Sequence, residues 1–368
     1  MMWHVEYRPV EPDSILSYVE SYSHRDWLES NEDEGVVRFA MVGLGWWTRD
    51  EAMPAVEHST FCRTTVVVSG SAEKAANVED EHGSIQVGLT YDEFVAGEAT
   101  DAYDAVYVCT PNARHLPFVE AAVEHDKPIL CEKPMEATVE RGEGIVDACE
   151  DGSTTAMIAY RMHTEPVVRR ARELVRAGAV GDPVHVHGDM SQGILGWGAD
   201  QWRLDPALAG YGTSVMDLGI YSINTTRFVL DRDPVAVQSM MNSDHDAFSA
   251  VPDEVAAFTV AYEDDVYGTY TASQNAHQTS HLRVVGTDGM LLIEPAFHGE
   301  SSLELRVSGE TVDIDGKQVD QMEEEFDYFA DRLLTGRDPH GTPEHGLVDL
   351  RTLAAIYESS ETGRTIEL

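Results

Sequence analysis

The chain has 368 residues, and 66 Asp and Glu against 25 Lys and Arg give it a formal charge of −41 at pH 7. This charge repels nucleic-acid phosphates and anionic membranes, so we expect neither as a partner. Hydrophobic residues still make up 42% of the chain, and the acids are scattered through ordinary helix and strand patterns, which indicates a folded protein. Because concentrated salt screens the self-repulsion of such a surface, the composition is typical of a cytoplasmic protein of a halophile.

Residues 1–35 are predicted to form a helical arm ahead of the first domain. Asp13 suits a helix N-cap, and apolar residues recur at helical spacing over residues 13–29. The acidic "NEDEG" at 31–35 separates this arm from the first strand. No basic region followed by a long apolar run occurs, so we expect neither an export signal nor a membrane-spanning helix.

Residues 36–160 are predicted to form an α/β domain built on a doubly wound parallel sheet. Short runs rich in β-branched residues alternate with helical stretches, and the runs are continuously apolar, as in strands covered on both faces. The six runs are "VVRFAMVGLG", "RTTVVVSG", "SIQV", "DAVYVCTP", "KPILCEKP" and "TTAMIA".

The first of these runs ends in a glycine-containing turn. Gly43 and Gly45 follow the apolar strand directly, and Thr48 stands where the third glycine of a GxGxxG motif would be. The two glycines permit a tight turn and the close approach of a pyrophosphate to a helix N-terminus. At the start of six βα units, this turn predicts dinucleotide binding.

The end of the second strand predicts which dinucleotide is bound. An Asp or Glu at this point would hold the ribose 2′-hydroxyl of NAD, but Ser69, Gly70 and Ser71 stand there. These small residues leave room for a 2′-phosphate, which Lys74 can neutralise, together with Arg49. We therefore expect NADP as the cofactor.

Residues 161–368 are predicted to form a second domain for substrate binding and oligomerisation. A helix over 164–178 leads into segments that resemble strands of a mostly antiparallel sheet with one open face. These segments lie near 183–190, 235–241, 255–262, 266–274, 281–286, 289–294 and 303–308, and two helices, around 320–334 and 346–359, follow them.

The order of motifs resembles the family of glucose-fructose oxidoreductase, inositol dehydrogenase and their relatives, over roughly residues 36–368. The matching segments are "VGLGWW", "VVVSGSAEKA", "VYVCTPNARHLPF", "CEKPM", "AYRMHTEP" and "QWRLDPALAGYGTSVMDLGIYSIN". The resemblance implies a Rossmann domain, a second α/β domain whose open sheet forms a homo-oligomer interface, and a substrate cleft between them. The chain is most similar to the aldose dehydrogenases of this family, which implies NADP-dependent oxidation of a sugar at C1, with D-xylose as the expected substrate.

The lysine of the family's EKP motif falls on Lys133, and its D-x-x-x-H/Y pair falls on Asp217 and Tyr221. Lys133 follows a strand at the carboxyl edge of the sheet, where ligands bind in open α/β folds. Its ammonium can bind the C1 oxygen or, if its pKa is low enough, accept the proton. Tyr221 is the expected general base, because a neighbouring ammonium stabilises a phenolate, although the two roles could be exchanged. Asp217, one helical turn away, is expected to orient the sugar or the tyrosine.

The other predicted site residues stand in the same motifs. We expect Tyr160 and His163 to border the substrate, and His115 to begin a helix near the nicotinamide. Tyr211, where family sequences usually have glycine, is expected to intrude on the substrate pocket. His185 and His187 alternate on one strand, but without a carboxylate-rich partner motif we expect no catalytic metal. Further residues expected to bind the cofactor are Trp46, Trp47, Thr110, Pro111, Asn112, Glu132, Arg161, Trp202 and Arg203.

Three alternatives remain open from the sequence. The first is a dehydrogenase of glucose, an inositol or a dihydrodiol. The second is an oxidoreductase that retains its cofactor tightly, as glucose-fructose oxidoreductase does. The third is a regulatory protein that senses a sugar or NADP without turnover, which loss of the lysine or the tyrosine would have favoured.

Overall fold

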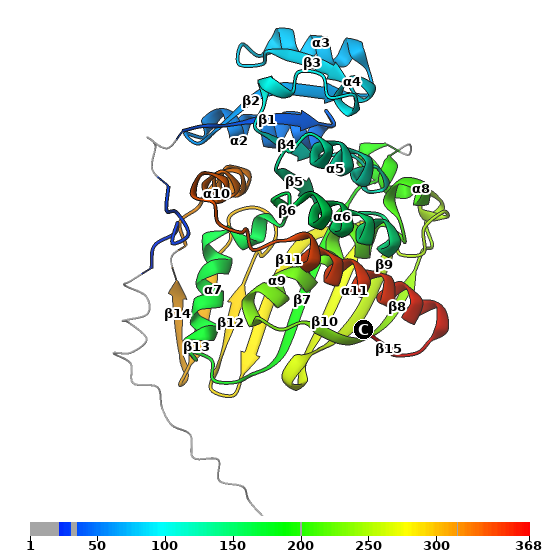
Figure 1. Ribbon diagram of the computed structural model, residues 1–368. Coiled ribbons are helices and arrows are strands. Elements are labelled where there is room, and N and C mark those ends of the chain that lie inside the picture. Colours follow the sequence, from blue (N-terminus) through cyan, green and yellow to red (C-terminus); the bar gives the residue numbers. More distant parts are fainter. Residues whose placement is uncertain (1–21, 31–34, 199–200, 315) are drawn as a thin grey trace, which may run out of the picture.

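The computed structural model describes residues 22–30, 35–198, 201–314 and 316–368, which build two sheets with their helices (Figure 1). The helix predicted over 13–29 falls largely outside these ranges, and its last part, from residue 22 onward, is a turn. The backbone N–H groups of Glu29 and Ser30 donate to Asp331 Oδ1 at 2.8 and 2.6 Å. These long-range hydrogen bonds replace the intrahelical ones, so helical periodicity misled the prediction at this end.

The first sheet has six parallel strands in the order β3-β2-β1-β4-β5-β6, which confirms the predicted Rossmann-type fold. The third strand begins at residue 87, later than predicted, because its pairing with β2 starts opposite Val66. The strands are β1 (Val37–Val42), β2 (Cys62–Ser69), β3 (Val87–Thr90), β4 (Ala105–Val108), β5 (Ile129–Glu132) and β6 (Ala156–Ala159).

Helices cover both faces of the first sheet, and its central strands are fully buried, as continuous apolar runs require. One of the covering helices comes from the far end of the chain: in α10 (Gln321–Thr335), Phe326 packs edge-on against Phe39 with ring centroids 5.1 Å apart. The other helices are α2 (Met53–His58), α3 (Ala72–Glu81), α4 (Tyr91–Val95), α5 (His115–Glu124) and α6 (Val139–Gly152).

The second sheet has nine strands in the order β14-β13-β12-β11-β7-β10-β9-β8-β15. Neighbouring strands are antiparallel except β7 and β10, which confirms the predicted mostly antiparallel sheet. The strands are β7 (Pro183–Gly193), β8 (Pro234–Asn242), β9 (Val255–Tyr262), β10 (Val266–Ser273), β11 (Asn275–Gly286), β12 (Gly289–Ile293), β13 (Leu303–Val307), β14 (Glu310–Ile314) and β15 (Ile366–Glu367).

Two of these strands, β14 and β15, were not predicted. The hairpin from β13 to β14 turns at Ser308 and Gly309, which both have positive φ, as a two-residue hairpin turn requires. That Ser-Gly signal is present in the sequence. The two residues of β15 carry no such signal, because they become a strand only through their position beside β8.

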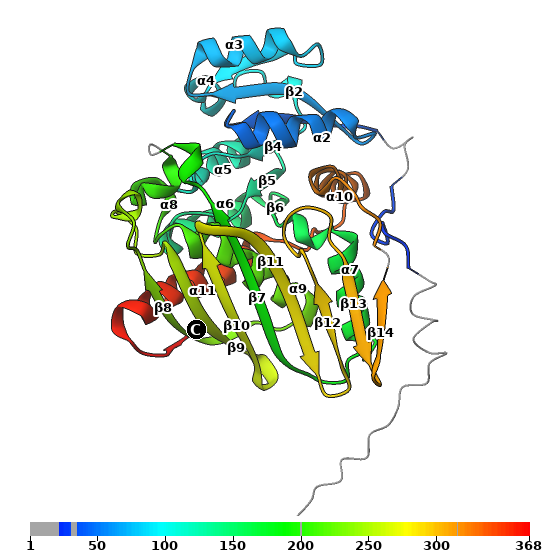
Figure 2. The ribbon, with the colours of Figure 1, turned by 180° about the vertical axis from the view of Figure 1, so that it is seen from behind.

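The second sheet is covered on one face only. Helices α7 (Pro166–Arg176), α9 (Ile220–Leu230) and α11 (Pro343–Thr362) lie against that face, and the view from behind shows the opposite face bare (Figures 1 and 2). Large side chains project from the bare face, including Met240, which is 78% exposed, and Tyr267, which is 52% exposed. Among the described residues, we find no helix with the length and apolar character needed to span a membrane.

Candidate active site

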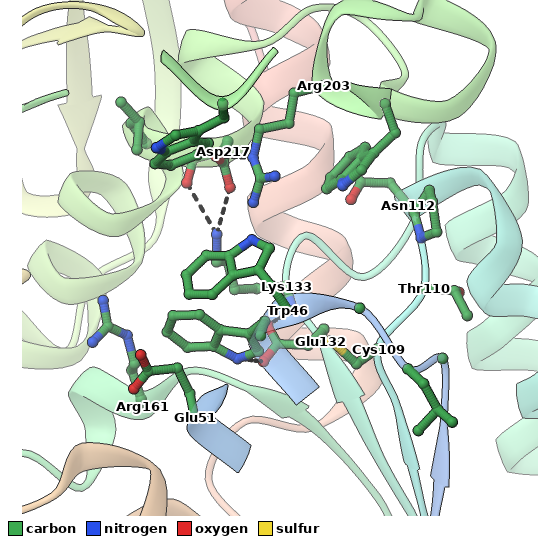
Figure 3. Close-up of a pocket in the computed structure, with 18 of the residues that line it drawn as sticks. Trp46, Glu51, Cys109, Thr110, Asn112, Glu132, Lys133, Arg161, Arg203 and Asp217 are labelled. Atoms are coloured by element: carbon green, nitrogen blue, oxygen red, sulfur yellow. Dashed lines mark hydrogen bonds and ion pairs between the residues drawn. The ribbon is translucent and has the colours of Figure 1, made fainter. Parts of the chain in front are cut away.

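A cavity of about 530 Å³ lies at the carboxyl ends of β1, β4 and β5, where the strand order of the first sheet reverses. The second sheet and α9 close its other side (Figure 3). Most of the residues predicted from the sequence to bind cofactor or substrate line this cavity: Gly43, Gly45, Trp46, Trp47, Ser69, Lys74, Thr110, Pro111, Asn112, Glu132, Lys133, Arg161, Trp202, Arg203, Asp217 and Tyr221.

Three residues predicted to bind the cofactor lie outside the lining. Arg49 Nη2 is 3.5 Å from Glu81 Oε2, so Arg49 pairs with that acid and does not join Lys74. The Ser71 hydroxyl accepts a hydrogen bond from the backbone N–H of Lys74 at 3.3 Å and thereby caps α3. Gly70 lies under the Tyr91 ring, which a Cβ at Gly70 would meet at 3.0 Å.

Three further predicted residues are buried away from the cavity. Both ring nitrogens of His115 lie within hydrogen-bond distance of backbone carbonyl oxygens, 2.9 Å from that of Thr110 and 3.1 Å from that of Met135, so the ring is enclosed between two loops. Tyr160 is only 6% exposed and does not border the cavity, contrary to expectation. The His163 ring stacks on Phe228, with ring centroids 4.3 Å apart. Burial, and to a smaller extent the nearby His345, hold the pKa of His163 well below its usual range. The predicted substrate contacts of Tyr160 and His163 therefore have no support in this geometry.

The glycine turn after β1 has the shape that a dinucleotide requires. Gly43 has φ +95°, and a Cβ there would lie 2.2 Å from the carbonyl oxygen of Cys109, so only glycine fits. A Cβ at Gly45 would meet nothing within 4 Å, so the space above the turn is open for a ligand. Thr48, in place of the third glycine, donates from Oγ1 to the Gly43 carbonyl at 2.6 Å and stabilises the turn.

The cavity reaches the end of β2, where Ser69 and Lys74 line it. Ser69 is buried, whereas the Lys74 side chain is exposed. A hydroxyl and an ammonium with no acid at this strand end suit the 2′-phosphate of NADP, because each can donate a hydrogen bond to a phosphate oxygen. The residues present therefore fit NADP.

Lys133 follows β5, and its ammonium is bound to Asp217 (Figure 3). Lys133 Nζ lies 2.9 Å from Asp217 Oδ1, 3.0 Å from the Asp217 carbonyl oxygen and 4.6 Å from the centroid of the Tyr221 ring. Burial lowers the pKa of Lys133, but the interactions with Asp217 and Tyr221 outweigh it, and the net pKa lies above the ordinary value. Of the two roles left open by the sequence, these contacts favour a permanent ammonium over a proton acceptor.

Asp217 lies in a π-helical turn, Val215–Gly219, that leads directly into α9. Its Oδ2 accepts hydrogen bonds from Arg203 Nε and Gln274 Nε2, both at 2.8 Å, while Oδ1 accepts one from Lys133. Burial raises the pKa of the Asp217 carboxyl, but Arg203 and Lys133 outweigh it and hold the pKa well below its usual range. Asp217 is thus a carboxylate that holds two cations, whereas the sequence predicted that it would orient the sugar or the tyrosine.

Tyr221 lies at the start of α9, between two cations. Its hydroxyl oxygen accepts a hydrogen bond from Arg161 Nε at 3.1 Å, and the Arg161 guanidinium carbon is 5.1 Å from the ring centroid. Arg161 also donates to the Phe297 carbonyl oxygen at 2.7 Å and to Gln321 Oε1. The Lys133 ammonium also lies 4.6 Å from the centroid of this ring, so two cations contact Tyr221.

Several residues of the lining were not predicted. The ring centroid of Trp197 lies 6.2 Å from that of Trp46, and both rings are about half exposed. Gln192 and Met190 line the cavity from β7, and strand alternation, which puts residues two apart on one face, was the signal available for them. His298 also lines the cavity, but it lies in a loop after β12 and carries no motif.

Two other features singled out in the sequence lie away from the cavity. Tyr211, expected to intrude on the pocket, accepts a hydrogen bond from the Val139 backbone N–H at 3.2 Å and stacks on Tyr357, with ring centroids 5.8 Å apart. Tyr211 is held by these partners and does not line the cavity. His187, part of the alternating histidine pair, has its Nδ1 2.6 Å from Thr269 Oγ1.

Comparisons with known proteins agree with this geometry. The family model described as an oxidoreductase family with an NAD-binding Rossmann fold (GFO/IDH/MocA) matches residues 37–160, and that of the GFO/IDH/MocA C-terminal domain matches residues 168–292. A D-xylose 1-dehydrogenase [NADP(+)] of Haloarcula marismortui is 53% identical over 351 residues, which cover 94% of this chain and 97% of that protein.

Two more distant relatives resemble the chain over nearly the same length. D-xylose 1-dehydrogenase (NADP(+)) 2 of Haloferax volcanii is 32% identical over 334 residues, covering 90% of this chain and 99% of that protein. The crystal structure of an aldose-aldose oxidoreductase from Caulobacter crescentus, complexed with glycerol, superposes with a TM-score of 0.85 at 31% identity, covering 90% of this chain and 100% of the other.

Proposed function

Because the chain belongs to the GFO/IDH/MocA family of oxidoreductases, we propose that it is an NADP-dependent D-xylose 1-dehydrogenase that oxidises the sugar at C1 to the lactone. The observation on which this rests is the single cavity that joins the glycine turn and Lys74 to the cluster of Lys133, Asp217 and Tyr221. The 53% identity to the Haloarcula enzyme supports D-xylose as the sugar.

NADP, when bound by the glycine turn, Ser69 and Lys74, supplies the acceptor for the C1 hydride. The task of the protein is then to bind the sugar and remove the proton of the C1 hydroxyl. Lys133, held as an ammonium by Asp217, donates a hydrogen bond to the C1 oxygen and stabilises negative charge there as the proton leaves.

Tyr221 is the proposed general base. Its phenolate oxygen takes the proton from the C1 hydroxyl, and the C1–O bond becomes the lactone carbonyl as the hydride leaves C1. Arg161, whose Nε donates to the Tyr221 oxygen at 3.1 Å, stabilises the phenolate before transfer. Asp217 takes no proton, because its carboxylate is bound by Lys133 and Arg203.

The experiment that tests this function is a cofactor-reduction assay of the purified protein in concentrated KCl. We expect NADPH to form fastest with D-xylose in a panel of pentoses, hexoses and inositols, and NAD to serve poorly. If an inositol or a hexose reduces NADP faster than every pentose, that compound would replace D-xylose as the proposed substrate. No reduction with any compound of the panel would favour a sensing protein.

Replacing Lys74 with alanine is expected to raise the KM for NADP about tenfold, because an ammonium bound to a phosphate is lost. The KM for NAD should not change, because NAD lacks that phosphate. Arg49→Ala is the matched control: Arg49 pairs with Glu81 outside the cavity, so its NADP KM should stay within about twofold of the wild type. An unchanged NADP KM in Lys74→Ala would contradict this assignment.

The bare face of the second sheet supports a homo-oligomer. Met240 and Tyr267 are large side chains that are 78% and 52% exposed on this face. Exposed apolar side chains that cluster on one face are typical of a protein–protein interface. We place the proposed oligomer in the cytoplasm of a halophile, in pentose catabolism, as the acidic composition and the xylose substrate suggest. Light scattering at high salt should give at least twice the mass of one chain, and the mass of a monomer would contradict the proposal.

A further inference from the structure

Two glutamine side chains in a row connect Asp217 to a second residue of the cavity lining. Gln274 is the single residue between β10 and β11, and it is fully buried. Its Nε2 donates to Asp217 Oδ2 at 2.8 Å, and its Oε1 accepts from Gln192 Nε2 at 2.9 Å. Gln192, in β7, is half-buried and lines the cavity.

The backbone of Gln274 is held on both sides. Its N–H donates to Ser214 Oγ at 2.9 Å, and its carbonyl oxygen accepts from the Ile194 N–H at 3.0 Å. Ser214 immediately precedes the π-helical turn that carries Asp217, so one short segment anchors both the carboxylate and the amide that binds it. Gln274 therefore cannot turn away from Asp217 without breaking several hydrogen bonds.

The direction of these hydrogen bonds follows from the charge of Asp217. A carboxylate accepts hydrogen bonds and cannot donate them, so Gln274 must face it with the NH₂ group. The Gln274 carbonyl oxygen then faces Gln192, which must present its own NH₂ group in turn. The Oε1 atom of Gln192 is consequently left as the end of the amide available to the cavity.

An acceptor at this position differs from the cationic groups nearby. Lys133, Arg161 and Arg203 line the same cavity and can only donate hydrogen bonds. A sugar hydroxyl offers both a proton and lone pairs. The lining also contains the carboxylates of Glu51, Glu132 and Asp217, but those of Glu132 and Asp217 already accept hydrogen bonds from protein groups. Gln192 Oε1 adds a neutral acceptor for the proton of a sugar hydroxyl.

We propose that Gln192 determines sugar specificity by accepting a hydrogen bond from one ring hydroxyl, and that Gln274 is the positioning residue that fixes its orientation against Asp217. This inference rests on the proposed function. It adds that the enzyme discriminates by the presence of a single hydroxyl, because an analogue without it would leave Gln192 Oε1 unpaired.

The test compares D-xylose with its 2-, 3- and 4-deoxy analogues at saturating NADP, in the wild type, Gln192→Met and Gln274→Met. Methionine has nearly the length of glutamine but forms no comparable hydrogen bond. In the wild type, we expect one deoxy analogue to lose about tenfold or more in kcat/KM through the contact with Gln192. In Gln192→Met, the kcat/KM values for that analogue and for D-xylose should agree within about twofold. Relative to the wild type, the KM for D-xylose should rise while kcat changes little.

Gln274→Met is expected to lower kcat as well as raise the sugar KM, because Asp217, and with it Lys133, loses a fixed partner. The dissociation constant for NADP, measured by fluorescence, should stay unchanged in both variants. Gln86→Met is the matched control, since Gln86 is exposed just before β3 and does not line the cavity, and it should behave as the wild type. Thermal melts will identify any variant that fails to fold, and Gln192→Met alone suffices for the test.

Two results would overturn the inference while leaving the proposed function intact. One is a Gln192→Met enzyme that still discriminates against the same deoxy sugar as the wild type. The other is a weaker NADP affinity in Gln192→Met, which would mean that Gln192 contacts the cofactor. A wild-type protein that oxidises no sugar would instead overturn the proposed function, and the inference with it.

Discussion

Lys133→Met is expected to lower kcat about a thousandfold while the dissociation constant for NADP stays within about twofold. The variant removes the ammonium that we propose binds the C1 oxygen and that lies 4.6 Å from the centroid of the Tyr221 ring. The contact with the C1 oxygen and the contact with Tyr221 both favour loss of the proton from the C1 hydroxyl, so removing Lys133 should lower kcat. Steady-state kinetics at saturating NADP and sugar, with NADP affinity from fluorescence, measure this result.

The same variant should still fold. Removing one partner of a buried ion pair typically costs about 3–5 kcal/mol, but the Asp217 carboxylate keeps Arg203 and Gln274, so the cost should lie at the low end. Lys317→Met is the matched control, because Lys317 is exposed and outside the cavity, and its turnover should equal that of the wild type. A Lys133→Met enzyme that is well folded and turns over at the normal rate would refute the whole mechanism.

Tyr221→Phe is expected to lower kcat/KM for the sugar by about two to three orders of magnitude. The phenyl ring keeps its contact with the Lys133 ammonium, so the variant removes only the oxygen that accepts from Arg161 and that we propose takes the proton. Because the C1 proton loses its proposed acceptor, kcat at saturating sugar should fall as well. The dissociation constant for NADP should stay within about twofold of the wild type.

This prediction separates Tyr221 from Lys133 as the base. The contacts with Asp217 and Tyr221 hold the pKa of Lys133 above its ordinary value, which favours the ammonium form and leaves the base role to Tyr221. Tyr160→Phe is the matched control, because Tyr160 lies outside the cavity, and its kcat/KM should stay within about twofold of the wild type. A Tyr221→Phe variant with near-normal turnover would remove Tyr221 from the base role.

The fold was largely predictable because its signals are local. Continuous apolar runs separated by helices indicate a covered parallel sheet, and alternating runs with turns indicate a sheet with one open face. Where a segment depends on distant partners, prediction failed: residues 22–30 form only a turn at 24–27, with the N–H groups of Glu29 and Ser30 bound to Asp331, and β15 pairs with β8.

For the predicted site residues too, local signals led to correct predictions and contacts with distant residues did not. Gly43, Gly45 and Lys133 stand directly after strand ends, and parallel strands bring those ends to one edge of the sheet whatever the details of packing. Arg49 and His163 were predicted from sequence proximity alone, and each has a partner elsewhere, an acid for Arg49 and the Phe228 ring for His163.

By itself, the sequence determined the acidic surface, the dinucleotide turn and the position of Lys133, because charge and strand-end location depend on short stretches of chain. Asp217 and Tyr221 were identified through the resemblance of their motif to the family. Only the tertiary structure decided what these groups do to one another. Asp217 holds Lys133 as an ammonium, and Gln274, 57 residues beyond Asp217, fixes that carboxylate. A hydrogen bond over such a separation depends on how two sheets and a helix pack, and no local pattern of residues records it.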